Sequence, residues 1–293
     1  MNISSLVIGL TIVSFGTSLP ELLVNLYSSF NGNSDIGVGN ILGSNIANIL
    51  LILGVSAIIF PMAITKNTYF IEVPFSLTAT LLVGFLANTE LDPNSTGHTI
   101  SRIDGLFLLF FFALFMAYVY VASKEKSEDD FEKDEKGELM SKRKSFIYIL
   151  TGIVGLYFGG DWVVTGAVKI ATDFGLTKAF VGLTVVAVGT SLPELVTSAV
   201  AALKKNSDIA VGNVVGSNIF NLLWILGLSA VLKPIEYHEV SNSDIYMIII
   251  SSTLLILGIV VGKRAQISRW KGVIFFIVYL IYMYTLIKGE GLI

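Results

Sequence analysis

Two glutamates lie within apolar stretches of the chain, among other oxygen-bearing residues. Glu21 and Glu194 each end a copy of the sequence GTSLPE, in which a threonine precedes the glutamate by four residues. This spacing places Thr17 beside Glu21, and Thr190 beside Glu194, on one face of a helix. A carboxylate inside a membrane helix costs about 2.5–3.5 kcal/mol to insert and by default indicates an ion or substrate pathway. The alternative is a protonated, structural glutamate bonded to a neighbouring helix.

A proline precedes each glutamate and adds main-chain oxygens at the same place. Pro20 and Pro193 have no N–H, so the carbonyls of Gly16 and Gly189, one turn earlier, lose their helical partners. Free carbonyls at membrane depth are tolerated only beside protein groups or a wet cavity. Each motif is therefore expected to offer a carboxylate, a hydroxyl and main-chain oxygens close together. The alternative is a proline kink used only for packing.

A second motif, GNxxGSNxxN, follows each first motif and supplies neutral oxygens. Ser44 and Asn48 are four residues apart, and Ser217 and Asn221 repeat the arrangement. The glycines have the GxxxG spacing that lets helices approach closely, so their expected role is to bring the oxygens near the glutamates. The first asparagine of each motif could instead cap a broken helix; these residues are Asn40 and Asn213.

These candidate ligands are hard oxygens, and the chain has no cysteine. Ca²⁺ takes about six to eight oxygens, whereas transition metals prefer nitrogen or sulfur. Sodium also favours oxygen ligands and could compete for the same cage. Two carboxylates nearly neutralise one divalent ion, and they also suit several monovalent ions at adjacent positions. The residues therefore predict transported Ca²⁺ and Na⁺, and no cofactor.

The elements that carry these residues are apolar segments long enough to cross a bilayer. The chain has 293 residues, of which 54% are hydrophobic and 14% charged, and its mean hydropathy is +0.77. This composition predicts an all-α, polytopic membrane protein, and the net charge of −3 argues against a nucleic-acid partner. Nine transmembrane helices are predicted: Ser4–Ser29, Ile36–Phe60, Phe70–Ala87, Ile103–Ala122, Phe146–Ala171, Thr177–Leu203, Ile209–Leu232, Ile245–Gly262 and Gly272–Ile287.

The motifs belong to an internal repeat. Residues 9–61 match residues 182–234 without a gap, and about 30 of the 53 positions are identical. Equivalent points lie five predicted helices apart, so the copies should cross the membrane in opposite senses, as in the inverted repeats of secondary transporters. Residues 1–122 are then the first repeat and residues 146–293 the second. The first helix of the first five-helix repeat is absent, and we expect a truncation.

The polar segment 123–145 is predicted to be a cytoplasmic loop. With that loop inside the cell, fourteen Lys and Arg residues lie on the cytoplasmic side, against four in the loops of the opposite side. Basic residues favour the cytoplasmic side of a membrane protein. This bias predicts a multi-pass protein of the plasma membrane with Met1 inside the cell.

At these motifs the chain resembles the cation/calcium exchanger superfamily, and most closely its prokaryotic sodium/calcium exchangers. GTSLPE and GNxxGSN, each present twice, correspond to the two α-repeats of that superfamily. The resemblance implies four adjacent cation sites that share two carboxylates, with three sodium ions exchanged electrogenically for one calcium ion. It also implies a monomer with alternating access, in which the first helix of each repeat helps to gate the site.

Carried over by position, the resemblance assigns the cation ligands. The ligands it implies are Glu21, Glu194, Thr17, Thr190, Ser44, Ser217, Asn48 and Asn221, with the main chains of Ser14 and Ala187. Some family members have aspartate where this chain has Asn221, and that aspartate is linked to potassium transport. The asparagine favours a potassium-independent exchanger. The loop 123–145 is too short for the calcium-sensing domains of animal exchangers.

The sequence leaves four alternatives to a potassium-independent sodium/calcium exchanger. A calcium/proton exchanger or a potassium-dependent sodium/calcium exchanger could use the same glutamates. An intramembrane enzyme is disfavoured because the chain has no GxGD pair and no HExxH motif. A membrane scaffold without transport requires that the mature protein truly lack the missing helix. The residues and the resemblance together favour a transporter over an enzyme.

Overall fold

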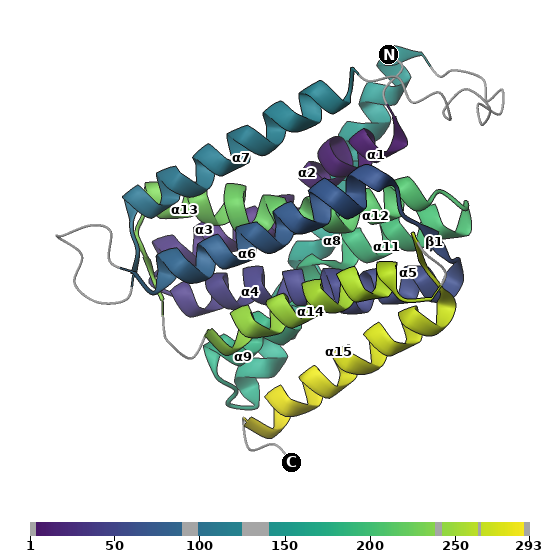
Figure 1. The fold of residues 1–293 in the computed structure, drawn as a ribbon. Helices are drawn as coiled ribbons and strands as arrows, with labels where there is room; N and C mark the ends of the chain where they lie inside the picture. The colour runs from purple at the N-terminus through teal and green to yellow at the C-terminus, as the bar shows by residue number, and fades with distance from the viewer. Residues whose placement is uncertain (1–3, 90–98, 125–140, 238–241, 263–264, 290–293) are drawn as a thin grey trace.

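A computed structural model describes residues 4–89, 99–124, 141–237, 242–262 and 265–289 of the chain, and most of these residues are helical (Figure 1). The spans that carry the two GTSLPE motifs start at equivalent caps. Ser4 accepts a hydrogen bond from the N–H of Val7, and Thr177 accepts one from the N–H of Phe180. These side chains satisfy N–H groups that the first turn leaves without a helical partner. The similarity between the two repeats therefore includes the way these spans begin.

The first half contains α-helices, three π-helical segments written η, and two short strands. Its elements are α1 (Ser5–Ile8), η1 (Gly9–Val13), α2 (Ser14–Thr17), α3 (Leu19–Phe30), α4 (Ser34–Ala47), η2 (Asn48–Ile52), α5 (Leu53–Ile59), β1 (Met62–Ala63), η3 (Thr68–Glu72), α6 (Val73–Ala87), β2 (Thr99–Ile100) and α7 (Arg102–Ala122).

The second half begins with a long helix and then follows nearly the same order. Its elements are α8 (Lys142–Asp173), α9 (Lys178–Val181), η5 (Gly182–Val186), α10 (Ala187–Thr190), α11 (Leu192–Leu203), α12 (Ser207–Ile219), η6 (Phe220–Ile225), α13 (Leu226–Leu232), β3 (Ile235–Glu236), α14 (Asn242–Val260), β4 (Gln266–Ile267) and α15 (Arg269–Gly289).

The span that carries GTSLPE is bent in each repeat, although each was predicted as one continuous helix. The chain bends by 42° between Ser5–Thr17 and Leu19–Phe30, and by 43° between Lys178–Thr190 and Leu192–Leu203. A proline occupies the first turn of both α3 and α11. Proline fits the start of a helix because no N–H is needed there, but it cannot continue a preceding helix. The bend places each glutamate in the first turn of a new helix.

The described residues contain six helices long and apolar enough to cross a membrane, and eight if each bent pair is one span. The helix α8 occupies the place of the fifth predicted span, and it is not among these eight. The count of nine therefore stays a prediction. Residues 125–140, which are most of the predicted polar loop, lie outside the described residues, and α8 begins inside the predicted loop at Lys142.

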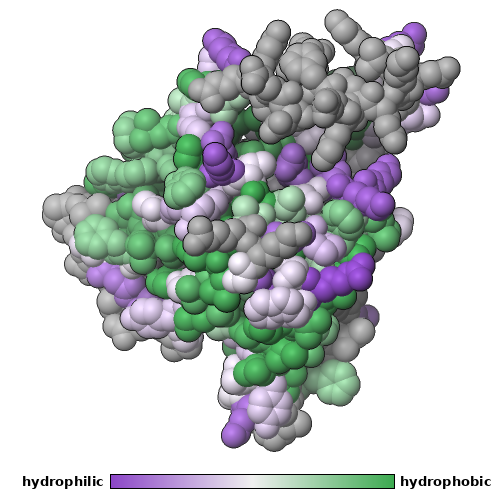
Figure 2. Space-filling view, turned by 45° about the vertical axis from the view of Figure 1, so that its right-hand side comes forward, coloured by the Kyte–Doolittle hydropathy of each residue, from purple (hydrophilic) through white to green (hydrophobic). Residues whose placement is uncertain are grey.

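The two GNxxGSN helices form the centre of the molecule. The spans Ser34–Ile59 and Ser207–Leu232 are each 83% buried, whereas α7 and α15 are each 22% buried. Figure 1 shows α7 and α15 along opposite edges of the bundle, and Figure 2 shows apolar residues over much of the visible face. Short strand pairs join the halves, because β1 pairs with β4 and β2 with β3. Polar groups are therefore held inside a bundle whose exposed surface is largely apolar.

Candidate cation-binding site

Glycines on the central helices let each helix pack directly on the GTSLPE span of the other repeat. A Cβ atom on Gly43 of α4 would lie 2.5 Å from the carbonyl oxygen of Leu183 and 2.8 Å from the Cβ of Ala187. A Cβ atom on Gly216 of α12 would meet the hydroxyl of Ser14 and lie 3.0 Å from the Cα of Leu10. Only hydrogen fits at these positions. The close approach that the GxxxG spacing predicts is therefore present in both repeats.

The two motif glutamates are buried and interact with the opposite repeat. Glu21 and Glu194 each have 0% of their surface exposed. The hydroxyl of Ser191 donates to Oε1 of Glu21 at 3.4 Å, and the hydroxyl of Ser18 donates to Oε1 of Glu194 at 3.2 Å. Each GTSLPE motif thus places its serine on the glutamate of the other. The structure brings the two carboxylates into one interior cluster instead of exposing them to hydrocarbon.

The threonines of the motifs bond to the asparagines that begin GNxxGSN. Thr17 donates to Oδ1 of Asn213 at 3.2 Å, and Thr190 donates to Oδ1 of Asn40 at 2.9 Å. These contacts again cross from one repeat to the other. The asparagines therefore orient threonine hydroxyls from the opposite repeat, and Asn213 also donates to the hydroxyl of Ser198 at 3.0 Å.

The predicted serine ligands lie on the same cluster. Ser217 donates to Oε1 of Glu194 at 3.4 Å. Ser44 lies 3.5 Å from the hydroxyl of Thr190 and donates to the carbonyl oxygen of Ala187 at 3.4 Å. In the first repeat, the carbonyl oxygen of Ser14 accepts a bond of 3.4 Å from Thr17. These serines and main-chain oxygens therefore lie one hydrogen bond from the motif side chains.

The two predicted central asparagines differ in their hydrogen bonds. Asn48 donates through Nδ2 to Oδ1 of Asn218 at 2.9 Å, whereas no described residue bonds to either polar atom of Asn221. Both lie at the start of π-helical segments, whose wider turns often occur at functional sites.

Several buried oxygens of the site accept no hydrogen bond and are available to a ligand. Among the described residues, no partner is found for Oε2 of Glu21, Oε2 of Glu194, Oδ1 of Asn48 or Oδ1 of Asn221. A buried oxygen without a partner is unfavourable, so these four atoms favour a bound cation or water. The described residues form no cluster of three or more His, Cys, Asp or Glu. Two carboxylates with neutral oxygens remain, a donor set that suits Ca²⁺ or Na⁺.

Ser18 and Ser191 were not among the predicted ligands. Each is buried, with 0% and 3% of its surface exposed, and each bonds to a glutamate from the other repeat. A signal for them exists in the sequence, because both stand inside the repeated GTSLPE. Helical spacing within one copy does not reveal the role, since the partner lies about 170 residues away.

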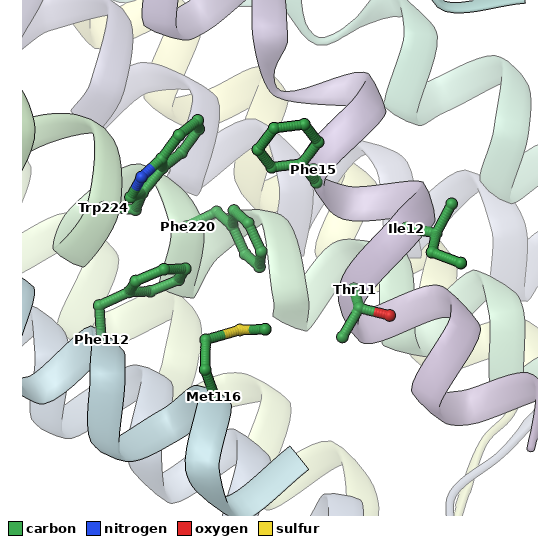
Figure 3. A pocket seen from close by; sticks show the side chains of 7 residues that line it. All are labelled: Thr11, Ile12, Phe15, Phe112, Met116, Phe220 and Trp224. Carbon is green, nitrogen blue, oxygen red and sulfur yellow. The ribbon is translucent and has the colours of Figure 1, made fainter. Parts of the chain in front are cut away.

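An apolar cavity of about 400 Å³ lies beside the site and not in it. Figure 3 shows its lining, in which Phe15 faces Phe220 and Trp224, and Phe112 and Met116 come from α7. No carboxylate lines this space. Two of its aromatic residues, Phe15 and Phe220, are the chain neighbours of Ser14 and Asn221, so this cavity adjoins the site.

Comparison with known proteins places the chain in a family. The profile described as sodium/calcium exchanger protein matches residues 1–121 and 144–288. The chain belongs to the sodium/calcium exchanger family. The predicted relation to prokaryotic sodium/calcium exchangers is therefore confirmed, and the family is one of transporters.

Two relatives and one solved structure illustrate the similarity of this exchanger to known proteins. The sodium/calcium exchanger MaX1 of Methanosarcina acetivorans is 31% identical over 98% of this chain and 90% of its own. The inner membrane protein YrbG of Escherichia coli K12 is 34% identical over 97% of this chain and 88% of its own. The sodium-calcium exchanger NCX_Mj, soaked with 2.5 mM Na⁺ and 0.1 mM Ca²⁺, has a TM-score of 0.75 and 33% identity, covering 97% of this chain and 88% of its own.

Proposed function

We propose that this exchanger moves several sodium ions against one calcium ion, electrogenically and by alternating access. The observation that carries the proposal is the reciprocal contact between the motifs, in which each buried glutamate accepts a hydrogen bond from the serine of the other repeat. Displacing one repeat relative to the other would change the surroundings of both carboxylates together. That coupling is what an alternating-access cycle needs, because the ion site must be rebuilt on each side.

In this proposal the predicted ligand set binds the ions directly. The carboxylates of Glu21 and Glu194 balance the charge of one Ca²⁺, and the neutral oxygens complete its shell. The same oxygens, distributed over adjacent positions, hold the sodium ions. The ligands are Glu21, Glu194, Thr17, Thr190, Ser44, Ser217, Asn48 and Asn221, with the main chains of Ser14 and Ala187.

The proposed membrane arrangement is a pair of inverted repeats with nine crossing helices. Residues 1–122 and 146–293 form the repeats, and the polar segment between them, whose last residues begin α8, lies on the cytoplasmic side of the plasma membrane. The gap-free repeat and the excess of Lys and Arg on one side support this arrangement. We propose a monomer as the working unit, because each monomer contributes both glutamates.

Neutralising either glutamate tests the proposal. Glu21→Gln and Glu194→Gln each remove the negative charge from a ligand and nearly preserve its shape. Loss of a charged contact worth about 3 kcal/mol corresponds to about 100-fold, so calcium exchange should fall at least that far. The measurement is isotopic calcium uptake into sodium-loaded proteoliposomes, with size-exclusion chromatography to verify folding.

The matched control is another buried glutamate outside the cluster. Glu72 is 1% exposed and accepts a hydrogen bond from Tyr118 at 2.5 Å, so Glu72→Gln should keep exchange. Near-normal exchange by either site variant would remove that glutamate from the ion site. Uptake driven by a pH gradient without sodium would support calcium/proton exchange instead.

A further inference from the structure

The asparagine that ends each GNxxGSN motif is buried, but the two copies make different hydrogen bonds. Asn45 is 0% exposed and Asn218 is 1% exposed, and neither was among the predicted ligands. Nδ2 of Asn218 donates across the repeats, to the carbonyl oxygen of Asn45 at 3.4 Å. Nδ2 of Asn45 donates within its own helix, to the carbonyl oxygen of Ile41 at 2.7 Å. Identical residues at equivalent positions therefore have different partners.

The contacts of Asn218 permit only one orientation of its amide. An asparagine amide has one arm that donates and one arm that accepts, whereas a main-chain carbonyl oxygen only accepts. Because Nδ2 of Asn218 faces the carbonyl oxygen of Asn45, its Oδ1 faces the other way, toward Asn48. Nδ2 of Asn48 donates to that oxygen at 2.9 Å. The carbonyl group of Asn45 thus determines the orientation of Asn218, which in turn determines that of Asn48.

This arrangement leaves the oxygen of Asn48 free. Nδ2 of Asn48 is engaged by Asn218, and no described residue bonds to Oδ1 of Asn48. The two arms of an amide point in different directions, so this oxygen is turned away from Asn218. A cation binds the lone pairs of an oxygen, and the N–H groups of the other arm would repel it. The orientation seen in the structure is therefore the one that a cation ligand needs.

The second repeat has no such contact at its central asparagine. Asn221 is equivalent to Asn48, and no described residue bonds to its Oδ1 or its Nδ2. Asn45, which is equivalent to Asn218, has no partner for its own Oδ1 among the described residues. The structure therefore fixes the amide of Asn48 and leaves that of Asn221 without a hydrogen bond to hold it.

We propose that Asn218 is a positioning residue, which holds the amide of Asn48 with its oxygen available to the transported cation. The proposal rests on Asn48 being a cation ligand, as proposed above. Both asparagines are 1% exposed, so water does not readily replace the contact between them. A ligand that is already oriented loses less freedom when the ion binds, and this favours binding. Asn218 thus acts on the ion through Asn48 and does not bind it.

Removing the amide of Asn218 tests its role. In Asn218→Ala, neither arm of the Asn48 amide has a partner that selects its orientation. We expect the dissociation constant for calcium to rise about fivefold, which is the loss of roughly one ordinary hydrogen bond. The measurement is calorimetric titration of the purified protein with calcium. Asn218→Leu, which fills the space without polar atoms, replaces the alanine variant if that variant does not fold.

A double-mutant cycle with Asn48 separates positioning from packing. In Asn48→Asp the ligand is a carboxylate, which presents an oxygen whichever way it turns. Adding Asn218→Ala to this variant should not weaken calcium binding further, because no amide remains to be oriented. A packing defect would weaken binding in both backgrounds. If Asn48→Asp does not fold, Asn48→Ala takes its place, since it also lacks the amide.

The matched control is the equivalent asparagine of the first repeat. The amide of Asn45 donates only within its own helix, and Asn45→Ala keeps the main-chain carbonyl group that orients Asn218. This variant should change the dissociation constant for calcium less than twofold. An equal rise in Asn45→Ala and Asn218→Ala would mean that loss of either buried amide disturbs the packing, and it would overturn the proposal.

The remaining outcomes distinguish this proposal from the proposed function. Unchanged calcium binding in Asn218→Ala would overturn the positioning role, even if Glu21→Gln abolished exchange. An equal loss of affinity with and without Asn48→Asp would make Asn218 a packing residue and would also overturn it. If Asn48→Ala bound calcium normally, Asn48 would leave the proposed ligand set and the role of Asn218 would fall with it.

Discussion

At the residue scale, the glutamates depend on partners that come from the opposite repeat. Ser18 and Ser191 place their hydroxyls on Glu194 and Glu21, and Asn213 and Asn40 hold the motif threonines. Every one of these groups is at most 3% exposed, so water does not readily replace a lost contact. Single side chains outside the expected ligand set should therefore influence ion binding.

Removing a serine hydroxyl should weaken calcium binding. Ser18→Ala takes a donor from Glu194, and Ser191→Ala takes one from Glu21. A hydrogen bond to a charged group contributes about 1.5 kcal/mol or more, so we expect affinity to fall by roughly tenfold in each variant. Titration of the purified variants with calcium measures the change.

Thr253→Ala provides the control, because that hydroxyl donates only within its own helix, to Ile249. It should bind calcium like the unaltered protein. If both serine variants also bound calcium normally, the contacts across the repeats would have no part in holding the carboxylates ready for the ion.

At the element scale, the site depends on helices that touch through their backbones. The core helix α4 packs on η5 of the second repeat, and α12 packs on η1 of the first. Outer helices are joined by buried acid–tyrosine contacts that recur in the two halves, Glu72 with Tyr118 and Asp244 with Tyr282. The outer helices thus support the core while the glycines set the distance between the oxygen-bearing segments.

Adding a methyl group at the closest contact between α4 and η5 should push these two segments apart. Gly43→Ala places a Cβ atom 2.5 Å from a backbone oxygen, which cannot move without moving η5. Overpacking of this kind costs about 1–3 kcal/mol, and the displaced oxygens should reduce exchange at least tenfold. Thermal unfolding in detergent and calcium uptake measure the two effects.

The same substitution in α8 serves as the comparison. A Cβ atom on Gly152 would meet nothing within 4 Å, so Gly152→Ala should neither lower stability nor slow exchange. Full activity of Gly43→Ala would show that the close contact is not needed to form the site.

At the scale of the whole molecule, the two halves form one interlocked body. Each contributes one glutamate, one set of supporting oxygens and one central span that is 83% buried. The strand pairs β1–β4 and β2–β3 also connect the halves at their ends. Neither half retains the cluster alone, because the GTSLPE serine that donates to its glutamate is in the other half.

The opposite orientation of the repeats is testable with single cysteines. The chain has no cysteine, so an introduced one has no background. Asn31 and Lys66 are exposed and lie beyond opposite ends of the 26-residue span Ser34–Ile59. A membrane-impermeant maleimide added to intact cells should label Asn31→Cys and not Lys66→Cys.

The position of the second repeat that is equivalent to Asn31 completes this experiment. Lys204→Cys, which follows α11 as Asn31 follows α3, should stay unlabelled until the membrane is permeabilised. Labelling of Asn31→Cys and Lys204→Cys from the same side would contradict the inverted arrangement.

The sequence by itself determined the repeat, the two glutamates, and the family. These follow from the spacing of residues within each motif and from the gap-free match between residues 9–61 and residues 182–234. The helical ranges also followed closely, because apolar length is read directly along the chain. A proline kink was only one alternative at each motif, and the bends at Ser18 and Ser191 did not follow from the sequence because a proline only permits a break, and packing decides its angle.

Only the tertiary structure decided which side chains meet. The hydroxyl of Ser18 donates to Glu194, which lies 176 residues later in the chain. Oδ1 of Asn40 accepts a hydrogen bond from Thr190 instead of capping its own helix. The structure also revealed that Asn48 bonds to Asn218 whereas Asn221 has no partner among the described residues, an asymmetry between positions that are identical in the two repeats. The physical reason is that helical spacing fixes neighbours within a helix, whereas contacts between distant helices depend on how their backbones pack.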